Sequence, residues 1–139
     1  MFKLGEKSLA NLQGVHPDLV KVVRRAIQIS PVDFRVNEGR RTIERQRQLV
    51  KAGASMTMNS RHIHGFAVDL VPLVDLDKDG EIETEEMFHW PLYPLLAKAM
   101  KQAAKELGVP LEWGGDWRKF KDGPHFQLPK SKYPDPKGK

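Results

Sequence analysis

Two histidines and an aspartate are spaced so that a metal ion can bind between them. His62 and Asp69 lie on either side of Gly65, and a turn at this glycine brings a histidine beside an aspartate of the following apolar segment, FAVDLV. A bound metal ion offsets the cost of burying that carboxylate. His125 is the third candidate ligand. Spacing alone does not show whether His62 or His64 is the histidine that lies beside Asp69. Two imidazoles and one carboxylate leave a fourth tetrahedral position open, which is typical of catalytic rather than structural zinc.

Asp122 and Arg41 are the candidate side chains for metal-assisted hydrolysis besides the ligands. Hydrolysis requires a carboxylate that accepts a proton from water and returns it, and Asp122 stands three residues before His125. The developing oxyanion, or a carboxylate of the substrate, requires a fixed cation. We expect Arg41, just after the turn at Gly39, to supply this cation, and Arg40 is its rival.

Residues 75–86 match the twelve-residue calcium loop of an EF-hand. Acids occupy positions 1, 3 and 5, glycine position 6, an apolar residue position 8 and glutamate position 12. The candidate calcium ligands are Asp75, Asp77, Asp79, Glu81 through its backbone carbonyl, Glu83 through a water molecule, and Glu86. An EF-hand has a helix before the loop, whereas Pro72 and the strand-like segment around it stand there in this chain. Because only five residues separate Asp69 from Asp75, we expect calcium to order the loop and to switch on the nearby metal site.

Helices and short strands must hold these groups in place. Apolar residues at helical spacing predict amphipathic helices over residues 17–29 and 92–107, and Thr42 caps a polar helix that ends near residue 51. Strands are expected at residues 33–36, 66–71, 111–113 and 125–128. Helices at both ends with hairpin-like strands between them indicate an α+β fold, in which helices pack around a small antiparallel sheet. Aromatic residues beside these strands, namely Trp113, Trp117 and Phe126, suit either a pocket or the core.

Length and composition describe one soluble basic domain over residues 1–139, with 130–139 as a flexible basic tail. The absence of cysteine excludes disulfides, thiolate nucleophiles and cysteine-ligated zinc. The chain contains no apolar run long enough for a signal peptide or a membrane span. Seven of its acids lie in residues 75–86, so the rest of a chain with net charge +5 is strongly basic and suits an anionic surface. Nucleic acid is not expected as a partner, because basic residues do not alternate with aromatic ones and no zinc-finger spacing occurs.

The motif SxHxxGxAxD at residues 60–69, followed by DxxH at residues 122–125, carries a family resemblance. These motifs resemble the paired zinc motif of the LAS metallopeptidases, which include D-alanyl-D-alanine carboxypeptidases and dipeptidases, hedgehog-type domains and phage endolysins. Segments along nearly the whole chain are similar to the small phage L-alanyl-D-glutamate endopeptidases, among them Gly39-x-Arg41-Thr42 and Gly115-Asp116-Trp117. The resemblance implies His62, Asp69 and His125 as zinc ligands, Asp122 as general base, Arg41 as substrate or oxyanion clamp, and no ligand role for His64.

The resemblance also implies a substrate, the stem peptide of bacterial peptidoglycan, and cleavage between L-alanine and D-glutamate during host lysis. We expect a monomer that stays in the host cytoplasm without a signal peptide and reaches the periplasmic wall when the inner membrane is permeabilised. A D,D-carboxypeptidase or dipeptidase would use the same metal site. A non-catalytic wall-binding module with zinc and calcium is the alternative from another class, and Asp122 argues against it because such a module needs no base.

Overall fold

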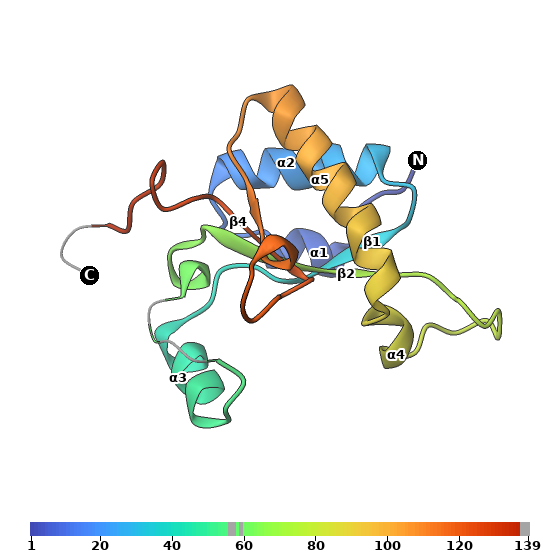
Figure 1. The fold of residues 1–139 in the computed structure, drawn as a ribbon, viewed down its shortest axis with the longest axis horizontal. Coiled ribbons are helices and arrows are strands. Elements are labelled where there is room, and N and C mark those ends of the chain that lie inside the picture. Colours follow the sequence, from blue (N-terminus) through green and yellow to red (C-terminus); the bar gives the residue numbers. More distant parts are fainter. Residues whose placement is uncertain (56–57, 59, 137–139) are drawn as a thin grey trace.

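Four short strands form one antiparallel sheet in the order β1-β2-β4-β3 (Figure 1). The computed structural model describes residues 1–55, 58 and 60–136 of the chain. Its strands are β1 (Phe34–Glu38), β2 (Ala67–Pro72), β3 (Glu112–Trp113) and β4 (His125–Gln127). Its α-helices are α1 (Glu6–Asn11), α2 (Pro17–Ile29), α3 (Ile43–Lys51), α4 (Thr84–Met87) and α5 (Tyr93–Leu107). Short 3-10 turns are η1 (Arg61–His64), η2 (Trp90–Leu92) and η3 (Gly114–Asp116). The chain therefore folds as a single α+β domain with a small antiparallel sheet, as the sequence predicted.

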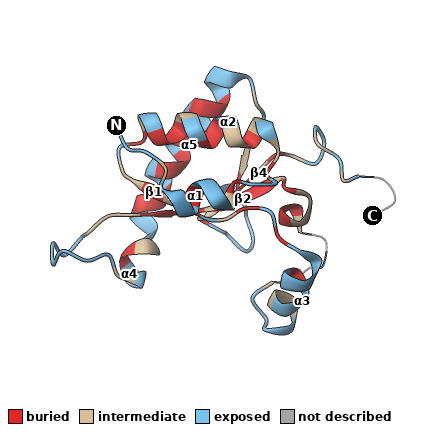
Figure 2. Cartoon of the chain, turned by 180° about the vertical axis from the view of Figure 1, so that it is seen from behind, coloured by how far each residue is buried: buried red, intermediate tan, exposed pale blue. Residues whose placement is uncertain are grey.

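The core lies between the sheet and the two long helices. Figures 1 and 2 show α2 and α5 crossing over one face of the sheet, and the buried residues gather where they meet it. The apolar stripe of α2 points inward, and the same holds for α5 around Leu96 and Met100. From the sheet, Val68 and Leu70 join this core. Because side chains alternate along a strand, Asp69 between them points to the opposite face. That opposite face is where α3 lies (Figure 1).

Local signals in the sequence explain where α2 begins and ends. The His16 side chain accepts a hydrogen bond from the Asp18 backbone N–H at 3.0 Å, which caps the helix, and Pro17 occupies the first helical position. The helix ends at Ile29, before Ser30 and a proline that disfavours helical backbone in the residue preceding it. Residues 84–87 form a short helix directly after the acidic loop, and α1 is an element that the sequence patterns did not predict.

The C-terminal segment is docked on the domain as far as the structure describes it. The Tyr133 hydroxyl donates to Asp18 Oδ2 at 2.7 Å, and the Asp135 carboxylate accepts from Arg61 at 2.9 Å. Residues 130–136 therefore differ from the flexible tail expected there, because a buried arginine and an aspartate in the first turn of α2 provide partners that the local sequence does not reveal. Residues 137–139 of that expected tail lie outside the described residues.

No helix in the described part of the chain combines the length and the apolar character that crossing a bilayer requires.

Candidate active site and metal centre

The η1 turn places His62 against the start of the sheet. Ser60 caps this turn by accepting a hydrogen bond from the His62 backbone N–H, and Gly65 ends it with φ of +76°. A side chain at Gly65 would collide with the Gly14 carbonyl, since an added Cβ would lie 2.3 Å from that oxygen. His62 Nδ1 lies 2.8 Å from the Gly39 carbonyl, which orients the ring so that Nε2 faces Asp69 at 3.2 Å. This carbonyl selects the tautomer in which Nε2 is available as a ligand.

The pairing of β2 with β4 brings His125 to the same point. Asp69 and His125 are direct partners in this antiparallel pair, and His125 Nδ1 lies 3.4 Å from Asp69 Oδ1. The other ring nitrogen of His125 lies 2.7 Å from Gln127 Oε1, so Nδ1 is the nitrogen left for a ligand. The two imidazole rings are 5.1 Å apart, centre to centre.

These three side chains suit a metal ion by their chemistry and by their support. Ligand atoms from His62, Asp69 and His125 all lie within 4.8 Å of one another, and both histidines are buried. Each imidazole is held through its other nitrogen by a carbonyl oxygen, which is the support that metal-binding histidines generally have. Two nitrogens and one carboxylate oxygen form a typical ligand set for zinc with an open position. His64 takes no part in this group.

The electrostatics of this group favour a charged carboxylate. Burial alone would raise the pKa of Asp69, but hydrogen bonds from His125 and His62 outweigh it and hold that pKa well below its ordinary value. Burial lowers the pKa of His125, and the adjacent Asp69 carboxylate more than reverses this, so the net shift is upward. The site thus concentrates negative charge on Asp69 between two imidazoles, as a divalent cation requires.

Asp122 lies beside the three candidate ligands on the rim of the same cavity. Two hydrogen bonds fix the backbone of Asp122. Its N–H donates to the Gly114 carbonyl, and its carbonyl accepts from the His125 N–H. A side chain at position 114 would clash there, since an added Cβ would lie 2.4 Å from the Asp122 carbonyl oxygen. Partial desolvation and the negative charge of Asp69 raise the pKa of the Asp122 carboxyl. A raised pKa suits a group that takes up and returns a proton.

Arg41 is buried next to Asp69, whereas Arg40 is exposed. The Arg41 guanidinium donates to Glu38 through Nε at 2.9 Å and Nη2 at 2.6 Å, and to Gln46 Oε1 through Nη1 at 2.7 Å. Its Nη2 also lies 3.9 Å from Asp69 Oδ2. Two of its five N–H groups make no hydrogen bond with a residue that the structure describes. Glu38 and Gln46 were not predicted from the sequence, although the three-residue spacing of Glu38 and Arg41 was a readable signal for an ion pair.

A cavity of about 640 Å³ joins these groups. Its described lining consists of Glu38, Arg41, Leu49, Ala54, Ser55, Ser60, Arg61, His62, Asp69, Trp117, Lys119, Phe120, Asp122, His125 and Gln127. Among the aromatic candidates, Trp117 lines the cavity, with its ring 5.2 Å from that of His125. Trp113 and Phe126 belong to the core instead. A larger cavity of about 1050 Å³ adjoins Arg41 and is lined by Arg40 and His64, but by none of the candidate ligands.

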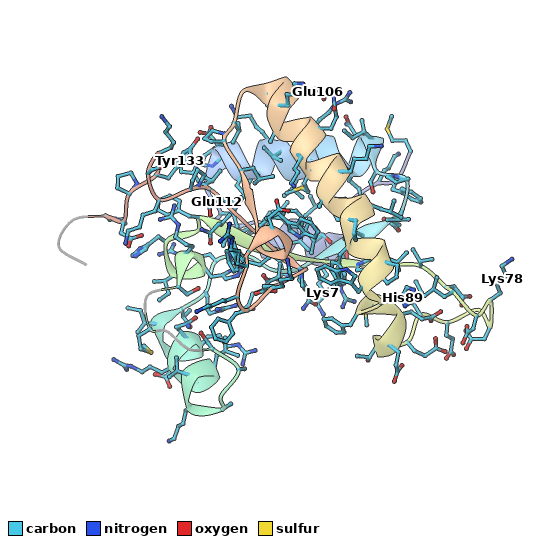
Figure 3. All side chains as sticks on the ribbon, in the orientation of Figure 1. Lys7, Lys78, His89, Glu106, Glu112 and Tyr133 are labelled. Atoms are coloured by element: carbon cyan, nitrogen blue, oxygen red, sulfur yellow. The ribbon has the colours of Figure 1, made fainter. Side chains whose placement is uncertain are left out.

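The acidic loop extends away from the body of the domain beyond the end of β2 (Figure 1), and Lys78 lies at its tip (Figure 3). Carboxylate oxygens of Asp75, Asp77 and Glu86 lie within 4.8 Å of one another, and those of Asp77, Asp79 and Glu83 do so as well. The Asp75 carboxylate accepts from the Gly80 N–H at 2.8 Å. The Glu81 side chain takes no part in either group of described carboxylates.

The carboxylates of this loop are crowded. Glu86 is buried and accepts hydrogen bonds from the backbone N–H groups of Leu76, Asp77 and Glu83. Hydrogen bonding with Asp79 and then with Glu86 raises the pKa of Glu83 to about 8. Among the described residues, Asp75 Oδ1 and Glu83 Oε2 are buried and have no hydrogen-bond partner. Closely spaced carboxylate oxygens of this kind favour the binding of a cation.

The chain is an α+β domain whose sheet carries a His-Asp-His cluster beside a carboxylic acid. Fold and cluster together can be compared with those of known proteins. Residues 1–128 match the family described as phage L-alanyl-D-glutamate peptidase, and the chain belongs to this family.

Individual relatives agree with that membership. The L-alanyl-D-glutamate peptidase of Escherichia phage T5 is 37% identical over 119 residues, which cover 84% of this chain and 82% of that protein. A protein of the same name from Listeria phage A118 is 33% identical over 125 residues, but this chain spans only 41% of its length.

Two solved structures are similar in fold. The Serratia marcescens L-Ala D-Glu endopeptidase ChiX has a TM-score of 0.82 and 46% identity, with 94% of this chain and 92% of ChiX covered. The vancomycin-resistance D,D-dipeptidase VanXYg has a TM-score of 0.51 and 17% identity, covering 86% of this chain and 53% of VanXYg, and indicates a shared fold.

Proposed function

We propose that this protein is a zinc-dependent endopeptidase that cleaves the L-alanyl-D-glutamate bond in the stem peptide of bacterial peptidoglycan. The observation that carries the proposal is one cavity lined by His62, Asp69, His125 and Asp122 in a member of the phage L-alanyl-D-glutamate peptidase family. A zinc ion supplies Lewis acidity and lowers the pKa of water at such a site.

Asp122 and Arg41 supply the other catalytic groups of the proposed reaction. Asp122 accepts a proton from the attacking water and returns it to the amine that leaves, and its raised pKa favours that return. Arg41 is fixed by Glu38 and Gln46, so its two unused N–H groups present a rigid donor to an oxyanion or a substrate carboxylate. The carboxylate of Glu38 neutralises much of the Arg41 charge, which favours the role of a directional hydrogen-bond donor.

We further propose that residues 75–86 bind calcium through Asp75, Asp77, Asp79, Glu81, Glu83 and Glu86, and that calcium switches the enzyme on. The grouping of the loop carboxylates and the raised pKa of Glu83 support this proposal. A calcium ion would relieve their mutual repulsion and order the loop. The enzyme would then be idle in a calcium-poor cytoplasm.

For the setting of the reaction, we propose a monomeric single domain that accumulates in the host cytoplasm and acts on the periplasmic wall after the membrane is permeabilised. The basic body outside the acidic loop would favour anionic envelope surfaces.

The test is mass spectrometry of purified Gram-negative peptidoglycan after digestion with zinc-loaded protein, with and without calcium, beside a chelated control. We expect stem peptides with a new D-glutamate amino terminus, in the zinc-loaded samples alone and in larger amounts with calcium. Loss of only the terminal D-alanine would assign the protein to the D,D-carboxypeptidases, and an absence of products would contradict an enzymatic role. Equal yields with and without calcium would contradict the switch.

A further inference from the structure

Three cations line the described part of the active-site cavity, and only one of them has no hydrogen-bond or ion-pair partner among the described residues. Arg41 is held by Glu38 and Gln46. Arg61 is buried and donates to Asp135 and to the Leu128 carbonyl. Lys119 is exposed on the rim and makes no hydrogen bond or ion pair with any described residue. A free ammonium group at the mouth of a cavity remains available to a ligand.

The loop that carries Lys119 is fixed at both ends. The backbone N–H groups of Trp117 and Asp122 both donate to the Gly114 carbonyl, so residues 117–122 form a closed loop. At its start the Trp117 ring packs against His125. The loop lies on the same side of the sheet as α3, away from α2 and α5 (Figure 1). Lys119 is therefore held at the same rim as the proposed general base.

Phe120 gives this loop a strained tip. Its φ is +54°, in the left-handed region that bulky residues rarely adopt, and 74% of its surface is exposed. Such strain at a cavity rim is more common where function requires a particular backbone shape. Phe120 directly follows Lys119, and two residues later the Asp122 N–H closes the loop on the Gly114 carbonyl.

The substrate of the proposed reaction carries a charge that this cavity must accommodate. D-Glutamate has two carboxyl groups, and only one can continue the peptide, so the residue after the cleaved bond keeps a free carboxylate. The cavity already contains the carboxylates of Glu38, Asp69 and Asp122, which repel an anion. An uncommitted cation on the rim offsets that repulsion, and a lysine side chain is long and flexible enough to reach a ligand.

We propose that Lys119 binds the free carboxylate of the D-glutamate residue. This contact determines which residue the enzyme accepts on the leaving-group side of the cleaved bond. This inference rests on the proposed function, since it names the substrate group that the same cavity recognises. The charged contact forms in the bound substrate, so its loss is expected to raise KM more than it lowers kcat.

The experiment compares two synthetic stem peptides, one with the free D-glutamate carboxylate and one in which that carboxylate is amidated. Wild-type protein should prefer the acid by about 10- to 100-fold in kcat/KM, the range of a hydrogen bond to a charged group. Lys119→Met should lose this preference because its kcat/KM falls for the acid and stays unchanged for the amide. Lys119→Arg should retain most of the preference. Arg118→Met removes an exposed charge of the same loop that does not line the cavity, and it should keep the wild-type preference.

Two results would overturn the proposal, and they are distinguishable. If Lys119→Met cleaves both peptides with the wild-type ratio, or slows both equally, Lys119 does not read the carboxylate and the proposed function stands. If wild-type protein with zinc cleaves neither peptide after L-alanine, the proposed function fails together with the inference.

Discussion

Asp69 of β2 and His125 of β4 are register partners, and their side chains meet 3.4 Å apart on the face of the sheet that points away from the core. The neighbours Val68 and Phe126 are paired in the same ladder and belong to the core. A slip of one residue would turn one of the two candidate ligands into the core. The packing of the sheet therefore also sets the geometry of the proposed metal site.

Replacement of any of the three candidate ligands should abolish zinc binding and activity together. His62→Ala, Asp69→Ala and His125→Ala each remove one of three donors from the proposed site. His64→Ala is the matched control, because it changes a histidine of the same turn that lies outside the group, and it should keep both properties. Zinc content by elemental analysis and peptide cleavage are the measurements. A zinc-free His64→Ala protein would show that the wrong histidine was chosen.

Asp122→Asn should separate chemistry from metal binding. The amide preserves the size of the side chain but cannot accept a proton, so cleavage should fall by about 100-fold or more while zinc content stays at the wild-type level. In wild-type protein the base must be ionised, and its pKa is raised by desolvation and by Asp69. In the pH profile of kcat/KM, the apparent pKa of the acidic limb should therefore lie above the ordinary pKa range of aspartate. An asparagine variant with wild-type cleavage would assign the base elsewhere.

The sequence predicted those parts of the molecule that depend on local patterns. Helix α2 has the predicted bounds, and the strand around Asp69 begins one residue later than expected, at Ala67. A glycine turn predicted a histidine beside Asp69, the family resemblance selected His62 and His125 as its partners, and the structure brings these three side chains together.

Long-range partners were not predictable in the same way. Gln46 supports Arg41 from the middle of a polar helix, and nothing in that helix marks one glutamine as buried. Tyr133 reaches Asp18 across most of the chain length. Phe120, which follows Lys119 at the cavity rim, has a left-handed backbone conformation, and the sequence does not indicate it because phenylalanine rarely adopts that region.

Gln46→Leu should weaken both stability and catalysis. Gln46 is fully buried and accepts a hydrogen bond from Arg41 Nη1, so a leucine leaves that donor without its partner. The expected loss in the free energy of unfolding is about 1–3 kcal/mol. Gln46→Glu keeps an acceptor oxygen and should retain more of the activity. Urea unfolding and steady-state kinetics on the same samples test this, and a leucine variant with wild-type kcat would argue against a role for a fixed Arg41.

Tyr133→Phe should remove the hydrogen bond from the C-terminal segment to Asp18 and raise the pKa of Asp18. The Tyr133 hydrogen bond is the main cause that lowers the Asp18 pKa below its ordinary value of 3.8. A lowered folded-state pKa stabilises the fold above about pH 4, and this stabilisation is lost as the pH falls through the folded-state pKa. The variant should therefore show an Asp18 pKa nearer 3.8 in a carboxyl NMR titration, and less difference in stability between neutral and acidic pH. An unchanged Asp18 pKa would mean that the hydroxyl does not hold this segment.

Tyr93→Phe should uncouple the calcium loop from the active site, because Tyr93 contacts a chain neighbour of each. Its hydroxyl donates to the Met87 carbonyl at 2.5 Å, next to the proposed calcium ligand Glu86, and its ring lies against the backbone of Gly123, next to Asp122. Burial, followed by the charges of Asp122 and Asp69, raises the Tyr93 pKa to about 12, so the hydroxyl stays a donor at neutral pH. Removal of this hydroxyl should leave calcium binding, measured by calorimetry, near the wild-type value, but should reduce the ratio of activities with and without calcium. Tyr133→Phe makes the same chemical change far from α4 and should keep the full ratio. If Tyr93→Phe is stimulated by calcium as strongly as wild type, the signal does not pass through the Met87 contact.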